Sequence, residues 1–383
     1  EGVRNLLGIK SNDPIPSKLI KSVKMGTTVA TNALLERKGE AVLLVTTKGF
    51  KDALRIGYQN RPRLFDKHIQ LPKGLYTQVI EVDERISKNG DILLPLDEAT
   101  VRQQLKAVFD KGLIKSIAIV FMHAYRFTEH EKVVAQIANE IGFRQISVSH
   151  KLSPLVKLIS RGDTTVVDAY LTPILRLYID RVRLELGKTQ LMFMQSNGGL
   201  TDASLFQGKD SILSGPAGGV VGMVHTAGEE NFKKVIGFDM GGTSTDVSHY
   251  DGIYERSFET EVAGIRMRTP MMSIHTVAAG GGSILHFDNG RYRVGPDSAG
   301  AVPGPSSYRR GGPLTIMDCN IMLGKIKSKF FPNVFGKDAA QPLNYDVVKE
   351  SFNKMANKIE LATGKKQSLE EVAEGFLTIA VEN

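Results

Sequence analysis

The sequence predicts an α/β fold built from two domains, and two observations support this prediction. The first is the length of 383 residues, which exceeds the usual size of one domain. The second is an alternation of strand-like and helical patterns in the first part of the chain. Apolar runs at 41–47 and 116–122 are typical of strands covered on both faces, and helical spacing follows at 128–140. This alternation favours a sheet flanked by helices.

The pattern then changes to a long helical stretch. A third strand is predicted at 145–149, and helical spacing continues over 152–186. Gly187 is the expected end of the helix, and Pro173 either starts a new helix or kinks a long one. We therefore expect three parts: 1–160 as the remainder of a first ATPase-like α/β domain, 161–190 as an interdomain helical segment, and 191–383 as a second ATPase-like domain.

The second half combines short strands with turns rich in glycine. Asp251-Gly252 and Asn289-Gly290 are favourable turn dipeptides, and 295–313, rich in Gly and Pro, is predicted to be a long ordered loop. The remaining elements expected are strands at 191–194 and 235–238, a turn at 196–199, a helix beginning at 214–219, and a helical tail over 347–383.

Composition excludes several classes of protein. Hydrophobic residues make up 42% and charged residues 23%, the balance of a globular enzyme. The net charge is +8, but Lys and Arg are dispersed, which indicates a solvated basic surface and no nucleic-acid partner. No apolar run is long enough to span a membrane. The single cysteine, Cys319, permits no internal disulfide and suits a cytoplasmic location.

The segment Asp239-Met240-Gly241-Gly242-Thr243-Ser244-Thr245-Asp246 follows an apolar strand and precedes another β run. Glycines let the backbone approach a polyphosphate closely, and successive N–H groups can surround one concavity. Gly241, Gly242, Thr243, Ser244 and Thr245 are therefore predicted to bind phosphate. Asp239 and Asp246 are predicted catalytic residues that hold a hydrated Mg²⁺ or position water. The alternative is an ordinary β-hairpin, and the segment is not a Walker loop.

A series of motifs resembles the hydantoinase/oxoprolinase family, which has the actin/Hsp70/sugar-kinase type of ATPase architecture. The resemblance covers essentially the whole chain in order, so it is far more specific than one motif. The segments that carry it are 25–40, 122–125, 130–131, 168–173, 196–200, 214–222, 239–246, 276–283 and 294–301.

The resemblance implies an ATP-dependent enzyme that opens a cyclic amide. Within the family the chain is most similar to the members that convert 5-oxoproline to glutamate in glutathione turnover. ATP and Mg²⁺ are the implied cofactors, and phosphorylation of the lactam oxygen would make its carbon attackable by water. The alternatives left open are a hydantoin hydrolase, a ketone carboxylase subunit, or a non-catalytic fragment or pseudoenzyme.

Further residues are candidates for contact with a ligand, each beside a structural alternative. Gly215 and Gly218 open a helix whose amino terminus attracts anions, although close packing also explains them. Thr27, Thr28 and Asn32 offer hydroxyl and amide groups, or alternatively cap a helix. The turn Gly280-Gly281-Gly282 is rich in amides, His275 could transfer a proton, and Arg161 could meet a substrate carboxylate. His123 and His130 could bind a transition metal, although packed or surface histidines are the more usual reading.

The ends of the sequence predict a chain cut from something longer. The first residues lack both a methionine and a secretory signal, and the last residues are in mid-helical pattern. The resemblance implies an earlier phosphate loop before Glu1 and a Gly-Gly-Ala-Gly segment after Asn383. We therefore expect a homo-oligomer or a complex with the remaining part of the enzyme, and no turnover by the isolated chain.

Overall fold

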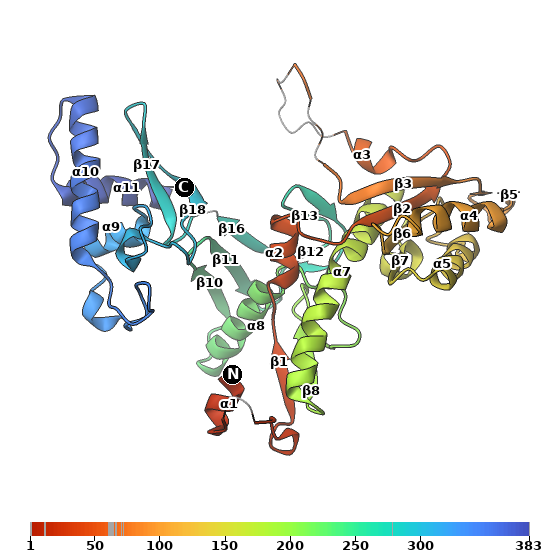
Figure 1. Ribbon diagram of the computed structural model, residues 1–383, viewed down its shortest axis with the longest axis horizontal. Helices are drawn as coiled ribbons and strands as arrows, with labels where there is room; N and C mark the ends of the chain where they lie inside the picture. Colours follow the sequence, from red (N-terminus) through yellow and green to blue (C-terminus); the bar gives the residue numbers. More distant parts are fainter. Residues whose placement is uncertain are drawn as a thin grey trace. The chain divides into compact units, whose positions relative to one another are not determined.

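The computed structural model describes residues 2–10, 13–59, 65, 67–69, 71, 73–277 and 279–382 (Figure 1). Their contacts form two compact units, one of Glu1–Phe232 with Ile253–Ser273 and one of Lys233–Gly252 with Ile274–Asn383. This grouping divides the chain after residue 232, whereas the sequence suggested a division near 190. The predicted division of this chain into 1–160, 161–190 and 191–383 stays a prediction.

The first unit contains parallel and antiparallel sheets with helices around them. Its helices are α1 Gly2–Leu7, α2 Val29–Leu35, α3 Ala53–Ile56, α4 Glu98–Phe109, α5 Glu129–Ile141, α6 Ser149–Leu152, α7 Leu158–Leu186 and α8 Ser214–Glu229. Its strands are β1 Ser22–Met25, β2 Val42–Thr47, β3 Tyr76–Val82, β4 Arg85–Ile86, β5 Ile92–Leu94, β6 Ser116–Val120, β7 Gln145–Val148, β8 Gln190–Met194, β9 Leu200–Asp202, β12 Arg256–Ser257, β13 Thr260–Val262, β14 Ile265–Met267 and β15 Met271–Met272.

The main sheet of this unit has the strand order β3-β2-β6-β7, with all pairs parallel. Alternate residues of β2 enter different cores. Leu43 and Val45 pack with residues of α4 and α5, whereas Val42 and Leu44 pack with residues of α7. Because side chains alternate along a strand, both faces are covered, which explains the continuous apolar run. Figure 1 shows α4 and α5 beside this sheet.

Helix α7 continues through Pro173 without interruption. A proline inside a helix removes the N–H that would reach the carbonyl four residues earlier. Here that carbonyl belongs to Ala169, and it accepts a hydrogen bond of 2.6 Å from the hydroxyl of Ser116 on β6. The prediction of a new helix start at Pro173 is therefore wrong, because tertiary packing supplies the missing donor. Gly187, with φ of 60°, ends the helix as predicted.

A second sheet pairs β1 with β8 in parallel and β8 with β9 antiparallel. The carboxyl-terminal half of α7 packs on it through Leu175 and Ile179. Segment 253–273 also belongs to the first unit, although it lies in sequence between two strands of the second. Its residues Ile265, Met267 and Met271 are buried in the core that contains α7.

The described part of the second unit contains an antiparallel sheet, a hairpin and three α-helices. The strands are β10 Lys234–Met240, β11 Thr245–Asp251, β16 Ile274–Val277, β17 Ser283–Asp288 and β18 Arg291–Ser298, and the helices are α9 Ile316–Met322, α10 Tyr345–Thr363 and α11 Leu369–Glu382. The sheet has the order β10-β11-β16, and β17 pairs with β18. The helices bury Ile316, Phe352 and Phe376 against this hairpin.

Most predicted elements are confirmed to within about two residues, including β2, β6, β7 and α5. Asn289 and Gly290 both have positive φ, as the hairpin turn between β17 and β18 requires. Two predictions need correction. The loop predicted at 295–313 begins inside β18, and the helical tail is two helices separated at Gly364. Among the described helices, none is long and apolar enough to cross a membrane.

Candidate functional site

The predicted phosphate loop is the turn between β10 and β11. Gly241 donates its N–H to the carbonyl of Ser244 at 2.9 Å, which closes the turn. The N–H groups of Gly242, Thr243 and Ser244 have no acceptor among the described residues. Gly241, Gly242 and Thr243 are exposed. The turn therefore presents several open backbone donors to solvent, as phosphate binding would require.

Asp239 and Asp246 face each other directly across the two strands. Residues opposite each other in an antiparallel pair project from the same face of the sheet, at a Cβ separation of about 5 Å. Oδ1 of Asp246 also accepts a hydrogen bond of 2.6 Å from the hydroxyl of Thr276 on β16. Two carboxylates on one face fit a hydrated Mg²⁺, which prefers oxygen ligands and keeps several waters.

The triple-glycine turn packs directly on the phosphate loop. Gly281 and Gly282 donate their N–H groups to the carbonyls of Gly241 and Gly242, at 3.0 and 2.7 Å. The N–H of Gly280 reaches Oγ of Ser283 at 2.9 Å. All three amides therefore have acceptors within the chain. Ligand contact by these glycines stays a prediction, but in this arrangement it cannot use their N–H groups.

Glycine is required where the two turns meet. A Cβ on Gly280 would lie 2.8 Å from the carbonyl oxygen of Gly241, and one on Gly282 would lie 2.7 Å from that of Gly242. In addition, Oγ1 of Thr245 donates to the carbonyl of Ala279 at 2.7 Å. The triple-glycine turn thus packs closely against the predicted phosphate loop and holds it through backbone hydrogen bonds.

His275 lies next to Thr276 on β16 and opposite Val247. Because neighbouring residues on a strand project from opposite faces, its side chain is on the face away from Asp239 and Asp246. A proton transfer between His275 and these carboxylates therefore has no support in the geometry of the second unit.

The first unit contains a separate cavity of about 680 Å³, which we call the Thr28–Gly215 pocket. It brings together Thr27 and Thr28, which precede α2, and Gly215 and Gly218 of α8. The N–H groups of Thr28 and Gly215 find no acceptor in the described part of the chain. Asn32 is exposed and does not line the cavity. The other lining residues are Lys24, Met25, Gly26, Val29, Tyr178, Met194 and Leu200.

Two close contacts join the segments that form this pocket. Thr27 donates its N–H to Oγ of Ser214 at 3.1 Å, and that hydroxyl donates to the carbonyl of Thr27 at 2.8 Å. A Cβ on Gly26 would lie only 3.1 Å from Cα of Gly215. Segments almost 190 positions apart in the sequence therefore form one wall.

Comparison with known families identifies the chain. Residues 161–383 match the model described as Hydantoinase/oxoprolinase, and residues 1–142 match the model of the Hydantoinase/oxoprolinase N-terminal region. The chain belongs to the hydantoinase/oxoprolinase family.

Full-length relatives of this family member include two named 5-oxoprolinases. The chain is 46% identical to 5-oxoprolinase 1 of Arabidopsis thaliana and 44% identical to 5-oxoprolinase of Saccharomyces cerevisiae. In both comparisons all of this chain is covered, but only 33% of the relative. The chain thus spans about a third of the length of these proteins.

Solved structures confirm the predicted fold class. The ATP-dependent caprolactamase from Pseudomonas jessenii matches with a TM-score of 0.76 and 30% identity, over 99% of this chain and 55% of that one. Nucleotide-free acetone carboxylase matches with a TM-score of 0.74 and 23% identity, over 93% and 52% of the two chains. This hydantoinase/oxoprolinase chain therefore has the predicted actin-like ATPase architecture.

The remaining predicted site residues of this family member have structural partners. Arg161 is buried, and its guanidinium donates to Oγ of Ser149 and to the carbonyls of Phe121 and Leu155, at 2.9, 2.6 and 3.0 Å. A substrate carboxylate would have to compete with all three acceptors. Contact between Arg161 and a ligand stays a prediction.

The two histidines considered for a transition metal each contact another side chain, and metal binding by them stays a prediction. Nδ1 of His130 lies 2.8 Å from Oε2 of Glu84, and the ring of His123 packs against Tyr125. No three His, Cys, Asp or Glu residues are grouped to hold a metal ion within the described ranges.

Sequence reasoning did not identify Thr276 as part of the site. Its hydroxyl orients Asp246, yet 30 residues separate the two in the sequence. The only signal was the position of Thr276 at the start of the 276–283 motif. Lys24 and Tyr178 of the Thr28–Gly215 pocket had no local signal at all.

Proposed function

We propose that this chain is part of an ATP-dependent enzyme that opens 5-oxoproline to glutamate. The observation that carries the proposal is the turn between β10 and β11, where open N–H groups adjoin the Asp239–Asp246 pair on one face. The assignment of 5-oxoproline as substrate is supported by 46% and 44% identity to two 5-oxoprolinases over the whole chain.

A lactam is a poor electrophile, so its carbonyl must be activated before water attacks. Transfer of the γ-phosphoryl group of ATP to the lactam oxygen releases ADP and leaves an activated ring carbon. Water then adds to that carbon and the C–N bond breaks, so that the nitrogen leaves as the amine and the ring opens to an acyl phosphate. A second water attacks the acyl carbon, and inorganic phosphate leaves with the former lactam oxygen. The products are glutamate, ADP and phosphate.

The loop residues supply binding and charge compensation for this reaction. The N–H groups of Gly242, Thr243 and Ser244 bind phosphate oxygens, and the hydroxyl groups of Thr243 and Ser244 add further donors. The hydroxyl of Thr245 instead donates to the carbonyl of Ala279. Asp239 and Asp246 hold hydrated Mg²⁺, which neutralises phosphate charge when bound. Thr276 keeps the carboxylate of Asp246 in place.

The Thr28–Gly215 pocket binds an anionic group of the substrate or nucleotide in this proposal. Thr28 and Gly215 offer open N–H groups, and Gly215 lies at the positive amino terminus of the 16-residue helix α8. The exposed ammonium group of Lys24 adds a positive charge to the wall.

The chain works as part of a larger assembly in this proposal. It spans about a third of the 5-oxoprolinases that it matches, so its partner is the remaining part of the enzyme or a second copy. We place the reaction in the cytoplasm and in glutathione turnover. The one cysteine, Cys319, is buried and unpaired, in keeping with a reducing compartment.

Turnover measurements test the proposal. The purified chain alone should neither hydrolyse ATP nor open 5-oxoproline, and addition of the remaining part of the enzyme should restore ATP-dependent glutamate release. Asp239→Asn should lower kcat of the complete enzyme at least 100-fold, because a metal ligand is lost. Asp110→Asn, at an exposed position after α4, should leave it unchanged.

Substrate-dependent ADP release separates the alternatives. The complete enzyme should release ADP with 5-oxoproline, and not with hydantoin, caprolactam or acetone. ADP release with one of the other three alone would assign a different substrate. Absence of nucleotide binding would instead indicate a non-catalytic module.

A further inference from the structure

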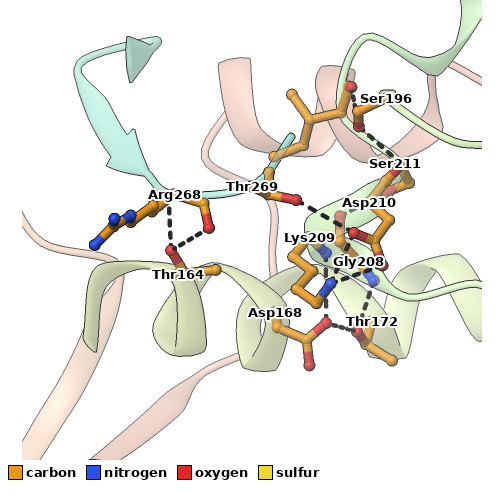
Figure 2. Close-up of polar contacts among 11 residues, drawn as sticks. Thr164, Asp168, Thr172, Ser196, Gly208, Lys209, Asp210, Ser211, Arg268 and Thr269 are labelled. Carbon is orange, nitrogen blue, oxygen red and sulfur yellow. Dashed lines mark hydrogen bonds and ion pairs between the residues drawn. The ribbon is translucent and has the colours of Figure 1, made fainter. Parts of the chain in front are cut away.

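Segment 208–213 leads into α8 and so sets the position of Gly215 in the Thr28–Gly215 pocket. It consists of a short 3-10 helix, Gly208–Asp210, followed by Ser211, Ile212 and Leu213. Side chains from several other elements hold it, and Figure 2 shows these contacts. The pocket does not include these side chains.

Helix α7 fixes the beginning of the segment. Oδ1 of the buried Asp168 accepts hydrogen bonds from Oγ1 of Thr172 at 3.0 Å and from the N–H of Lys209 at 3.4 Å. Oγ1 of Thr172 accepts the N–H of Gly208 at 2.9 Å. A Cβ on Gly208 would lie 2.7 Å from the backbone nitrogen of Thr172, so the segment lies directly against α7.

Ser196 fixes the middle of the segment (Figure 2). Its hydroxyl lies 2.8 Å from the carbonyl oxygen of Asp210 and 2.6 Å from that of Ile212, and it shares its single proton between them. Its N–H also donates to Asp210 O at 2.7 Å. Ser196 is buried, so removal of the hydroxyl would leave buried carbonyl groups without this donor.

The last residue of the segment is strained. Leu213 has φ of 57° and ψ of 23°, a left-handed conformation that costs about 1 kcal/mol for a residue with a Cβ. Its N–H donates to Oγ1 of Thr31 at 3.0 Å. A strained residue persists where its surroundings determine its conformation, and here Asp168, Ser196 and Thr31 do so.

We propose that Asp168 and Ser196 are positioning residues for the Thr28–Gly215 pocket. By fixing segment 208–213 they hold the open N–H of Gly215 toward an oxyanion, either a phosphate or a carboxylate. Neither residue touches the ligand. This inference rests on the function proposed above, because that function supplies the anionic ligand.

Backbone amide spectra of the full 383-residue chain test the inference. The chain is labelled with ¹⁵N-Gly and ¹⁵N-Thr and titrated separately with inorganic phosphate and with 5-oxoproline. The Gly215 amide should shift saturably with at least one probe, and which probe shifts it identifies the source of the oxyanion. Ser196→Ala and Asp168→Ala should each weaken that affinity at least fivefold.

Matched variants separate positioning from general destabilisation. Thr164→Ala removes an equally buried hydroxyl of α7 that bonds Arg268 and not segment 208–213, so affinity should not change (Figure 2). Asp168→Asn keeps an acceptor oxygen, and it should retain the affinity of the unaltered chain. If Asp168→Ala does not fold, the comparison of Ser196→Ala with Thr164→Ala still tests the inference.

Three outcomes would overturn the inference. One is a Gly215 amide that ignores both probes in the unaltered chain, and another is unchanged affinity in Ser196→Ala and Asp168→Ala. The third is an equal loss in Thr164→Ala. Substrate-dependent ADP release by the complete enzyme reports separately on the proposed function, so its failure is distinguished from a failure at Gly215.

Discussion

At the scale of single residues, the Asp239–Asp246 pair is costly for stability. Like charges directly opposite each other in an antiparallel sheet repel and destabilise the pairing. Among the described residues, Asp246 gains a side-chain hydrogen bond, from Thr276, and Asp239 gains none. A function that brings a cation to this face would explain why the carboxylates are there.

Asp163 gives a prediction about pH. Burial raises the pKa of Asp163 to about 6, although Arg266 bonds its carboxylate at 2.9 Å and acts in the opposite direction. Between pH 4 and 6 the unfolded chain ionises this group while the folded chain retains the proton. The free energy of unfolding should therefore fall as pH rises through this range, on the order of 3 kcal/mol at most.

Denaturant unfolding at several pH values measures this effect. Asp163→Asn should remove the part of the pH dependence that Asp163 causes between pH 4 and 6. The exposed Asp110→Asn is the control and should leave the dependence intact. An unchanged slope in Asp163→Asn would show that the buried carboxyl group titrates normally.

At the scale of elements, α7 depends on a hydroxyl from another element. Ser116→Ala should destabilise the first unit by about 1 to 2 kcal/mol, because the carbonyl of Ala169 then has neither the Pro173 N–H nor the Ser116 hydroxyl. Urea unfolding measures the change. Ser204→Ala removes an exposed hydroxyl and should cost much less.

The contact between the two glycine turns of the second unit is tested by alanine substitutions at two neighbouring glycines. Gly280→Ala should displace the phosphate loop and weaken binding of ATP with Mg²⁺ at least tenfold, because the new Cβ meets backbone atoms of the loop at 2.8 Å. Gly281→Ala is the matched control, since its Cβ comes only within 3.9 Å of Gly241 O. Calorimetry measures the binding of ATP with Mg²⁺. Equal affinity in both variants would show that the triple-glycine turn does not hold the predicted phosphate loop in place.

At the scale of the whole molecule, the second unit exposes an apolar strand face. Ile236, Phe238 and Met240 alternate along β10 and are 73%, 70% and 49% exposed. They belong to the edge strand of the sheet, and an apolar cavity of about 440 Å³ adjoins Phe238 and Met240. Exposed apolar surface of this kind marks an interaction site in many proteins.

The proposed assembly predicts that the apolar face of β10 contacts the remaining part of the enzyme. Phe238→Lys should weaken association with the remaining part of the enzyme at least tenfold, as measured by sedimentation velocity, because a charge replaces buried apolar area. Leu113→Lys, at a residue of the first unit that is 79% exposed, should not change it. Equal association of both variants would place the contact elsewhere.

The sequence alone determined the fold class, most elements of the central sheet, and the glycine turn between β10 and β11, whose phosphate binding stays a prediction. These features leave local signals, since a strand buried on both faces is apolar throughout and a turn that approaches phosphate needs glycine. The family resemblance carried the predicted chemistry, which the local pattern could not supply.

Only the tertiary structure decided which distant residues meet. It joined Thr27 to Ser214 and packed the Gly280–Gly282 turn against the predicted phosphate loop. It also placed His275 on the opposite face of the sheet from Asp246. The physical reason is that a hydrogen bond between distant segments depends on packing, whereas sequence periodicity reports only the local surroundings of each residue.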